Sequence, residues 1–183
     1  MILTKQLIKS KSLTANIVIA LSGSILLALL ARLSILVPFS PVPITGQTFG
    51  ILFLGAILGS RLGVLSVIAY ISEGLIGLPV FAGGTAGFLY LLGPTGGYLI
   101  GFIPAVYLVG YLAEKGWTNK FTTTFITMII CTVIIFIFGI SWLAVTAGFK
   151  TALSIGLYPY LPGAAVKIIL ATVIIYSINR FNR

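Results

Sequence analysis

Long apolar runs constrain this chain more than any other feature of its sequence. A helix needs ~20 apolar residues to cross the hydrocarbon core of a bilayer. Six segments approach that length, at residues 13–37, 45–58, 62–78, 88–112, 121–147 and 161–178. We therefore predict an all-α integral membrane protein with six transmembrane helices. The second and third segments are separated only by Gly59-Ser60-Arg61, which predicts a tight turn.

Charged side chains are too few to cover a water-facing surface. They make up 7% of the 183 residues, whereas soluble domains carry about 25%. The connections are short and no linker stands out, so we expect residues 1–183 to form a single transmembrane substrate-binding domain in the lipid bilayer. The basic residues do not cluster with aromatic ones, which argues against nucleic acid as a partner.

The distribution of basic residues predicts the orientation. Cytoplasmic loops of membrane proteins are enriched in Lys and Arg. With six crossings and a cytoplasmic N-terminus, only Arg32 and Lys150 fall near the outside. The bases on the cytoplasmic side are then Lys5, Lys9, Lys11, Arg61, Lys115, Lys120, Arg180 and Arg183. We predict a multi-pass protein of the cell inner (plasma) membrane with both termini in the cytoplasm.

Residues for catalysis or metal binding are scarce. The chain has no histidine, one cysteine (Cys131, in an apolar run) and two acids, Glu73 and Glu114. Histidine is the commonest general base and metal ligand. We therefore expect no enzymatic activity, no metal and no cofactor. A channel or a purely structural subunit is the competing class. Glu114, beside Lys115, is expected to be a solvated loop charge.

A proline-rich stretch and a glycine-rich stretch interrupt the helical pattern. Prolines at 38, 41 and 43 exclude helix and predict an extended, lid-like loop at the outer face, with Gln47 in the first turn of the next helix. Irregular backbone at membrane depth is tolerated where it lines a cavity. The candidate cavity walls, which could instead be simple turns, are Gly83-Gly84-Thr85 and Gly96-Gly97-Tyr98.

Two ionisable residues lie within or near the apolar runs. Lys167 sits near the start of the last one. A base in a spanning helix is costly and usually functional. Lys167 either extends to the interface or faces the cavity, where it and the helix N-terminus would favour a carboxylate. Glu73 either faces the interior or is exposed at the interface.

Small side chains form a stripe along the first segment. Helices approach closely in lipid through such residues. The stripe either packs inside the chain or forms a docking groove for a partner membrane protein. It consists of Ala20, Ser24, Ala28 and Ala31.

Several longer motifs carry a family resemblance. They are PVPITGQT (41–48), LGSRLG (58–63), GLPVF (77–81), GPTGGY (93–98) and the tail at 160–167 that contains Lys167. With these motifs the chain resembles the BioY family, the biotin-specific substrate-capture subunits of energy-coupling-factor transporters. The resemblance implies biotin binding near the outer face. It also implies docking through the first helix onto a transmembrane coupling subunit that is linked to two ATPases.

The resemblance implies a set of site residues. Lys167 would pair with the carboxylate of biotin, and the fused rings would lie among Phe81, Tyr90 and Tyr98. Gly83, Gly84 and Gly97 would allow close backbone contact.

Position 164 departs from the family, because Ala164 stands where an Asp is usual. The polar ring would then contact Thr85, Gln47, Tyr98 or water, or Glu73 would supply the missing carboxylate. The departure makes another small carboxylate vitamin or a biotin precursor the alternative ligand.

Overall fold

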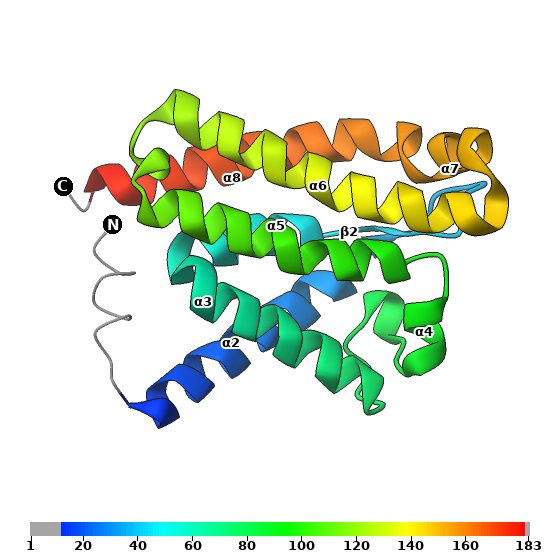
Figure 1. Cartoon of the computed structure of the whole chain (residues 1–183), viewed down its shortest axis with the longest axis horizontal. Coiled ribbons are helices and arrows are strands. Elements are labelled where there is room, and N and C mark those ends of the chain that lie inside the picture. The colour runs from blue at the N-terminus through cyan, green and yellow to red at the C-terminus, as the bar shows by residue number, and fades with distance from the viewer. Residues whose placement is uncertain (1–11, 182–183) are drawn as a thin grey trace.

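The computed structural model describes residues 12–181, and it is mostly helical (Figure 1). With the labels of Figure 1, the elements in chain order are α2 (Leu13–Arg32), β1 (Ser34–Ile35), β2 (Ile44–Thr45), α3 (Gln47–Leu75), η1 (Ala82–Gly84), α4 (Phe88–Leu92), α5 (Gly96–Glu114), η2 (Trp117–Asn119), α6 (Phe121–Ala147), α7 (Phe149–Gly156), η3 (Tyr158–Tyr160) and α8 (Leu161–Phe181). Lys5, Lys9, Lys11 and Arg183, which entered the prediction of orientation, lie outside the described residues.

Within residues 12–181, five helical stretches are long and apolar enough to cross a membrane. They are α2, α3, α5, α6 and the run from α7 through α8. Large apolar side chains such as Leu29, Val133 and Val166 are exposed on their outer faces. Outward-facing apolar side chains are what lipid requires, and the helices therefore form a membrane protein.

The turn predicted at Gly59-Ser60-Arg61 lies inside α3. Gly59 has φ 82° and ψ 179°, a conformation essentially restricted to glycine. A Cβ placed on Gly63 would lie 3.5 Å from the Cα of Gly55, although a straight helix separates such residues by about 12 Å. The chain therefore reverses at Gly59, and the two halves of α3 pack on each other (Figure 1).

Glu114 stabilises this bend, and the expectation of a solvated loop charge was wrong. Its Oε1 accepts hydrogen bonds from the backbone N–H of Ser60 at 2.7 Å and from the Ser60 hydroxyl at 2.9 Å. Ser60 begins the second half of α3, where backbone N–H groups lack partners within the helix. The carboxylate therefore caps the new helical start.

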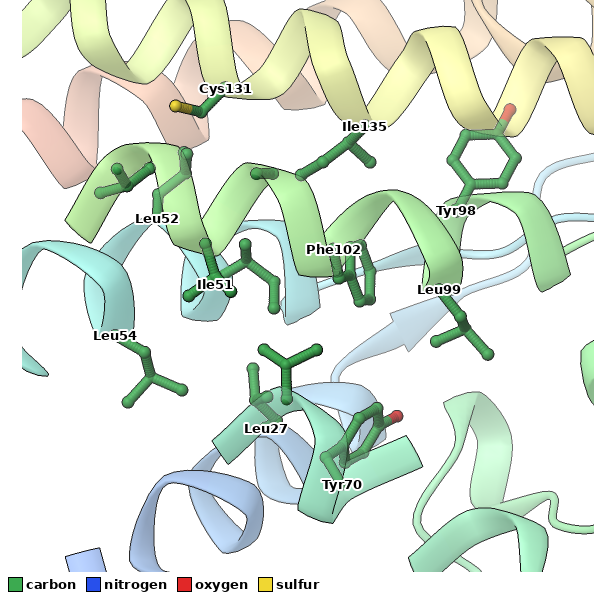
Figure 2. Close-up of a cluster of buried hydrophobic side chains, with 14 of the residues drawn as sticks. Leu27, Ile51, Leu52, Leu54, Tyr70, Tyr98, Leu99, Phe102, Cys131 and Ile135 are labelled. Atoms are coloured by element: carbon green, nitrogen blue, oxygen red, sulfur yellow. The ribbon is translucent and has the colours of Figure 1, made fainter. Parts of the chain in front are cut away.

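Helix α5 occupies the middle of the bundle, with α2 and α3 on one side and α6 and α8 on the other (Figure 1). Glycines allow its close contacts. A methyl group on Gly110 would overlap the backbone of Gly59 and Ser60, and one on Gly101 would come within 2.9 Å of the Cβ of Phe138 in α6. Figure 2 shows the core on both sides of α5, where Phe102 points toward α3 and Tyr98 toward α6.

Two predicted helix boundaries need correction. The first helix ends at Arg32 rather than at residue 37, and the chain then forms an antiparallel ribbon in which Ser34 pairs with Thr45. The predicted helix over 88–112 is divided into α4 and α5 at Gly93, whose backbone is extended. Pro94 explains the break, because a proline disfavours the helical conformation of the preceding residue. The ribbon, α4 and α7 gather at one end of the bundle (Figure 1).

Candidate functional site

A cavity with a volume of about 60 Å³ lies toward the ribbon end of the bundle. Its wall comes from the proline-rich loop, the first turn of α3, and parts of α4, α5, α6 and α8. The lining residues are Val42, Pro43, Ile44, Thr45, Gln47, Thr48, Ala82, Tyr90, Thr95, Tyr98, Leu99, Phe102, Thr132, Ile135, Phe136, Tyr160, Ala164 and Lys167. Segments more than 100 residues apart in sequence therefore meet at one small space.

Lys167 supplies the charge of this cavity. Its Nζ donates a hydrogen bond to Oγ1 of Thr48 at 3.0 Å, and the side chain is half-buried. The sequence left open whether Lys167 extends to the interface or faces the cavity, and the structure places it in the cavity wall. No acidic side chain is among the described residues that line the cavity. The wall thus carries one positive charge without a neighbouring negative one.

Gln47 presents a buried amide to the cavity. Its Oε1 accepts a hydrogen bond from Thr45 Oγ1 at 2.8 Å, and its Nε2 donates to the hydroxyl of Tyr70 at 2.5 Å. The Tyr70 hydroxyl donates in turn to the carbonyl of Val80 at 3.1 Å. The first turn of α3 is therefore connected to the loop that follows α3, and the amide is held in one orientation.

Hydroxyl groups fasten the proline-rich loop over the cavity. The hydroxyl of Tyr160 donates to the carbonyl of Val42 and also contacts Ser40 Oγ at 2.6 Å. Ser40 Oγ donates to the carbonyl of Ile155 at 2.7 Å. The loop is thus joined to η3 and to the end of α7. We call residues 38–43 the lid loop.

Aromatic residues form another side of the cavity. Tyr90 lines it and stacks on Phe81, with ring centroids 4.9 Å apart and an interplanar angle of 16°. Phe81 is fully buried behind Tyr90 and does not line the cavity itself. Tyr98 also lines the cavity, and its hydroxyl donates to the carbonyl of Gly156 at 2.7 Å. Phe81 therefore supports the wall that Tyr90 presents.

The glycine-rich loop borders a second cavity. This space of about 530 Å³ is lined by Gly83 and Thr85, among others, and it shares four wall residues with the first cavity. The four shared residues are Pro43, Ala82, Tyr90 and Thr95. Gly84 lies against the guanidinium group of Arg32. The predicted Gly83-Gly84-Thr85 element is thus adjacent to the small cavity, not in its wall.

Two other predicted site residues lie away from the cavity. Glu73 accepts a hydrogen bond from the hydroxyl of Ser24 at 2.7 Å and joins α3 to α2. It does not supply a carboxylate to the cavity wall. Gly97 packs against Trp142 of α6, where a methyl group would overlap the tryptophan side chain. Both residues hold helices together.

The small-residue stripe of α2 packs inside the chain. Ala20, Ser24 and Ala31 are buried and Ala28 is half-buried. This matches the first of the two interpretations that the sequence left open. Docking of a partner through these four side chains would require α2 to separate from α3.

Sequence reasoning missed several residues of the cavity wall. Thr48 follows Gln47 in the same helical turn, so the predicted position of Gln47 could have indicated it. Tyr160 is the first residue of the 160–167 motif, so that motif could have indicated it. Thr132 and Phe136 had no signal, because they lie within a continuous apolar run.

Comparison with known proteins gives a consistent family. The model of a family described as the BioY family matches residues 4–183. A probable biotin transporter BioY from Pyrococcus horikoshii is 36% identical over 138 residues, which cover 75% of this chain and 81% of the relative. The biotin transporter BioY from Thermotoga maritima is 34% identical over 179 residues, covering 97% of this chain and 98% of the relative.

A solved structure has the same fold. It is the crystal structure at 2.1 Å of the S-component for biotin from an ECF-type ABC transporter. It superposes with a TM-score of 0.80 at 30% identity, covering 91% of this chain and 92% of the other.

Proposed function

Because the chain belongs to the BioY family, we propose that it binds biotin and carries it into the cell as the substrate-capture subunit of an energy-coupling-factor transporter. The relatives are transporters of biotin by name, and the similar fold is that of a biotin S-component. The observation within this chain that carries the proposal is Lys167, a cation in a cavity wall that lacks acidic side chains among its described residues. A monoanionic ligand complements such a wall.

The carboxylate of biotin pairs with Lys167 in this proposal. A hydrogen bond between ionised partners is roughly twice as strong as one between neutral groups. The hydrogen bond to Thr48 already orients the ammonium group of Lys167. A carboxylate oxygen can either replace the Thr48 hydroxyl as the acceptor or bind the ammonium group together with it. The fused rings then lie along Tyr90 and Tyr98, whose aromatic faces offer a large apolar contact.

Binding requires the cavity to widen. Its volume of about 60 Å³ is well below the roughly 300 Å³ at the lower end of small-molecule sites. The adjoining space of about 530 Å³ shares Tyr90 and Pro43 with it. Displacement of Tyr90 and the lid loop would merge the two spaces, and this provides the route by which biotin enters.

The membrane arrangement follows from the same proposal. The whole chain acts as one substrate-binding domain in the plasma membrane, with six crossings and both termini in the cytoplasm. The reversal at Gly59 supports six crossings, because it turns α3 into two antiparallel halves. The excess of bases in the loops predicted to be cytoplasmic supports the orientation. A transmembrane coupling subunit and a pair of ATPases would supply the energy.

Ala164 supports a second candidate ligand. It lines the cavity near Lys167, and its methyl group cannot accept a hydrogen bond from a polar ring. The wall therefore also suits a small carboxylate with a less polar ring or chain, such as another vitamin or a biotin precursor.

Uptake and ligand identity can be tested together. Cells that require biotin and lack their own transporter, expressing this chain with its coupling subunits, should accumulate labelled biotin. Mass spectrometry of ligand retained through purification should detect biotin. Retention of a different carboxylate, without accumulation of biotin, would favour the second candidate and contradict the first.

A further inference from the structure

The amide of Gln47 has hydrogen-bonding capacity that the protein does not use. The residue is 5% exposed and lines the cavity. Thr45 occupies one lone pair of its Oε1, and Tyr70 accepts one N–H of its Nε2. A primary amide offers two N–H donors and two carbonyl lone pairs. One donor and one lone pair therefore remain for a ligand in the cavity.

The neighbouring groups fix which way this amide points. Tyr70 donates its only hydrogen to the carbonyl of Val80, so at Gln47 it can only accept. Exchange of the amide oxygen and nitrogen would place an acceptor against Tyr70 and break one of the two bonds. The unused donor and acceptor of Gln47 are therefore presented together in a fixed orientation.

The other polar side chains of the described wall residues present single hydroxyl groups or an ammonium group, and none of them pairs a separate donor with a separate acceptor as an amide does. The hydroxyls of Tyr98, Thr132 and Tyr160 already donate to backbone carbonyls. Lys167 has donors only. Among the described residues that line the cavity, Gln47 is the one with a side-chain amide.

We propose that Gln47 is the specificity-determining residue for the ureido ring of biotin. Its free N–H donates to the ureido carbonyl, and its Oε1 accepts from a ureido N–H. Thr45 and Tyr70 are positioning residues that act through Gln47. This inference rests on the proposed function and assigns the ring contact at a site where Ala164 has no hydrogen-bonding side chain. A ligand that lacks these groups would leave a buried amide unpaired, which is how such sites reject analogues.

The test compares biotin with the analogue whose ureido oxygen is replaced by sulfur, a weaker acceptor of the same overall shape and charge. Calorimetry gives the Kd of each ligand for the detergent-purified full chain, for Gln47→Met and for Gln47→Glu. Met removes the donor and the acceptor, while Glu keeps the acceptor. The parent should prefer biotin about tenfold, the value of one neutral hydrogen bond. In both variants the ratio of the Kd for the sulfur analogue to the Kd for biotin should fall close to one. In Gln47→Met the affinity for biotin should also fall about 10- to 100-fold.

The ratio of the two Kd values separates recognition from a structural role. A variant that merely distorts the cavity weakens both ligands equally and keeps the parent's preference, and that result would overturn the inference. Absence of any preference in the parent would overturn it as well. The affinity of the parent for biotin is measured first. If the parent does not bind biotin at all, the proposed function itself is contradicted, before either variant is compared. Melting curves identify a variant that does not fold, and the other variant then decides.

Discussion

Lys167 illustrates how one residue can define the chemistry of a membrane cavity. A half-buried ammonium group among apolar helices loses hydration, and the Thr48 hydroxyl at 3.0 Å replaces only part of it. A ligand carboxylate would restore a charge-assisted hydrogen bond. Charge on the ligand, rather than shape alone, should therefore account for much of the affinity.

Replacement of Lys167 by Ala should weaken biotin binding about 10- to 100-fold, because a hydrogen bond between charged groups contributes roughly 1.5–3 kcal/mol. Calorimetry measures the change, and biotin methyl ester, which lacks the negative charge, should bind both proteins with similar affinity. Lys150→Ala, at an exposed position of α7, is the matched control and should bind biotin like the parent. An unchanged affinity of Lys167→Ala for biotin, or an equal loss of affinity for biotin and for its methyl ester, would contradict the pairing.

The site could be predicted from sequence only where a residue type was unusual in its context. Lys167, Gln47 and Tyr98 stood out in this way and line the cavity, whereas Tyr90 and Ala164, which also line it, were indicated by the family resemblance. Other wall residues are ordinary threonines and apolar side chains, which only the packing of helices brings to one space. The hydrogen bond from Ser24 to Glu73, which lies outside the cavity, was also not predictable from the sequence, because it joins residues of two different helices.

At the scale of elements, the reversal of α3 against α5 organises the bundle. The bend needs glycine at position 59 for its backbone conformation and glycine at position 110 for the close approach of α5. Glu114, at the end of α5, then caps the second half of α3. Three residues from two helices therefore determine one turn.

Gly110→Ala should lower the melting temperature by about 3–10 °C, because the added methyl group overlaps the backbone at Gly59 and Ser60 and overpacking costs roughly 1–3 kcal/mol. Melting in detergent measures the effect. Gly163→Ala is the matched control, since its methyl group would meet only Ile44 at an ordinary 3.7 Å. Equal melting temperatures for the two variants would argue against the tight contact.

The lid loop gives a second prediction at this scale. Tyr160→Phe removes the hydroxyl that contacts Val42 and Ser40, so the loop should open more often and bound biotin should dissociate about tenfold faster, as expected for one lost hydrogen bond. Dissociation of labelled biotin measures the rate. Tyr158→Phe, at an exposed neighbouring position, should leave it unchanged. An unaltered rate in Tyr160→Phe would show that these bonds do not retain the ligand.

Helices and the turn at Gly59 were predictable because apolar length and glycine leave a local signal. The division between α4 and α5 was missed although Pro94 marks it, because the apolar run continues on both sides. The ribbon between Ser34 and Thr45 and the short helix α7 depend on contacts with the rest of the bundle. Such contacts are not encoded in any one segment.

On the scale of the whole molecule, long helices and short elements occupy different parts of the bundle. Long helices pack around α5, while the ribbon, α4 and α7 gather at one end (Figure 1). The cavity lies toward this end and is bounded partly by short elements. Tyr98, Leu99, Phe102 and Ile135 of the core in Figure 2 also line the cavity, so the cavity wall and the core share side chains.

Titration of biotin into the detergent-purified chain, without coupling subunits, tests the central claim most directly. Calorimetry should show one biotin per chain with a Kd below about 1 μM, which corresponds to roughly −8 kcal/mol. Such a result would establish that the cavity captures biotin by itself. Absence of binding at micromolar biotin, in protein that melts cooperatively, would contradict the claim.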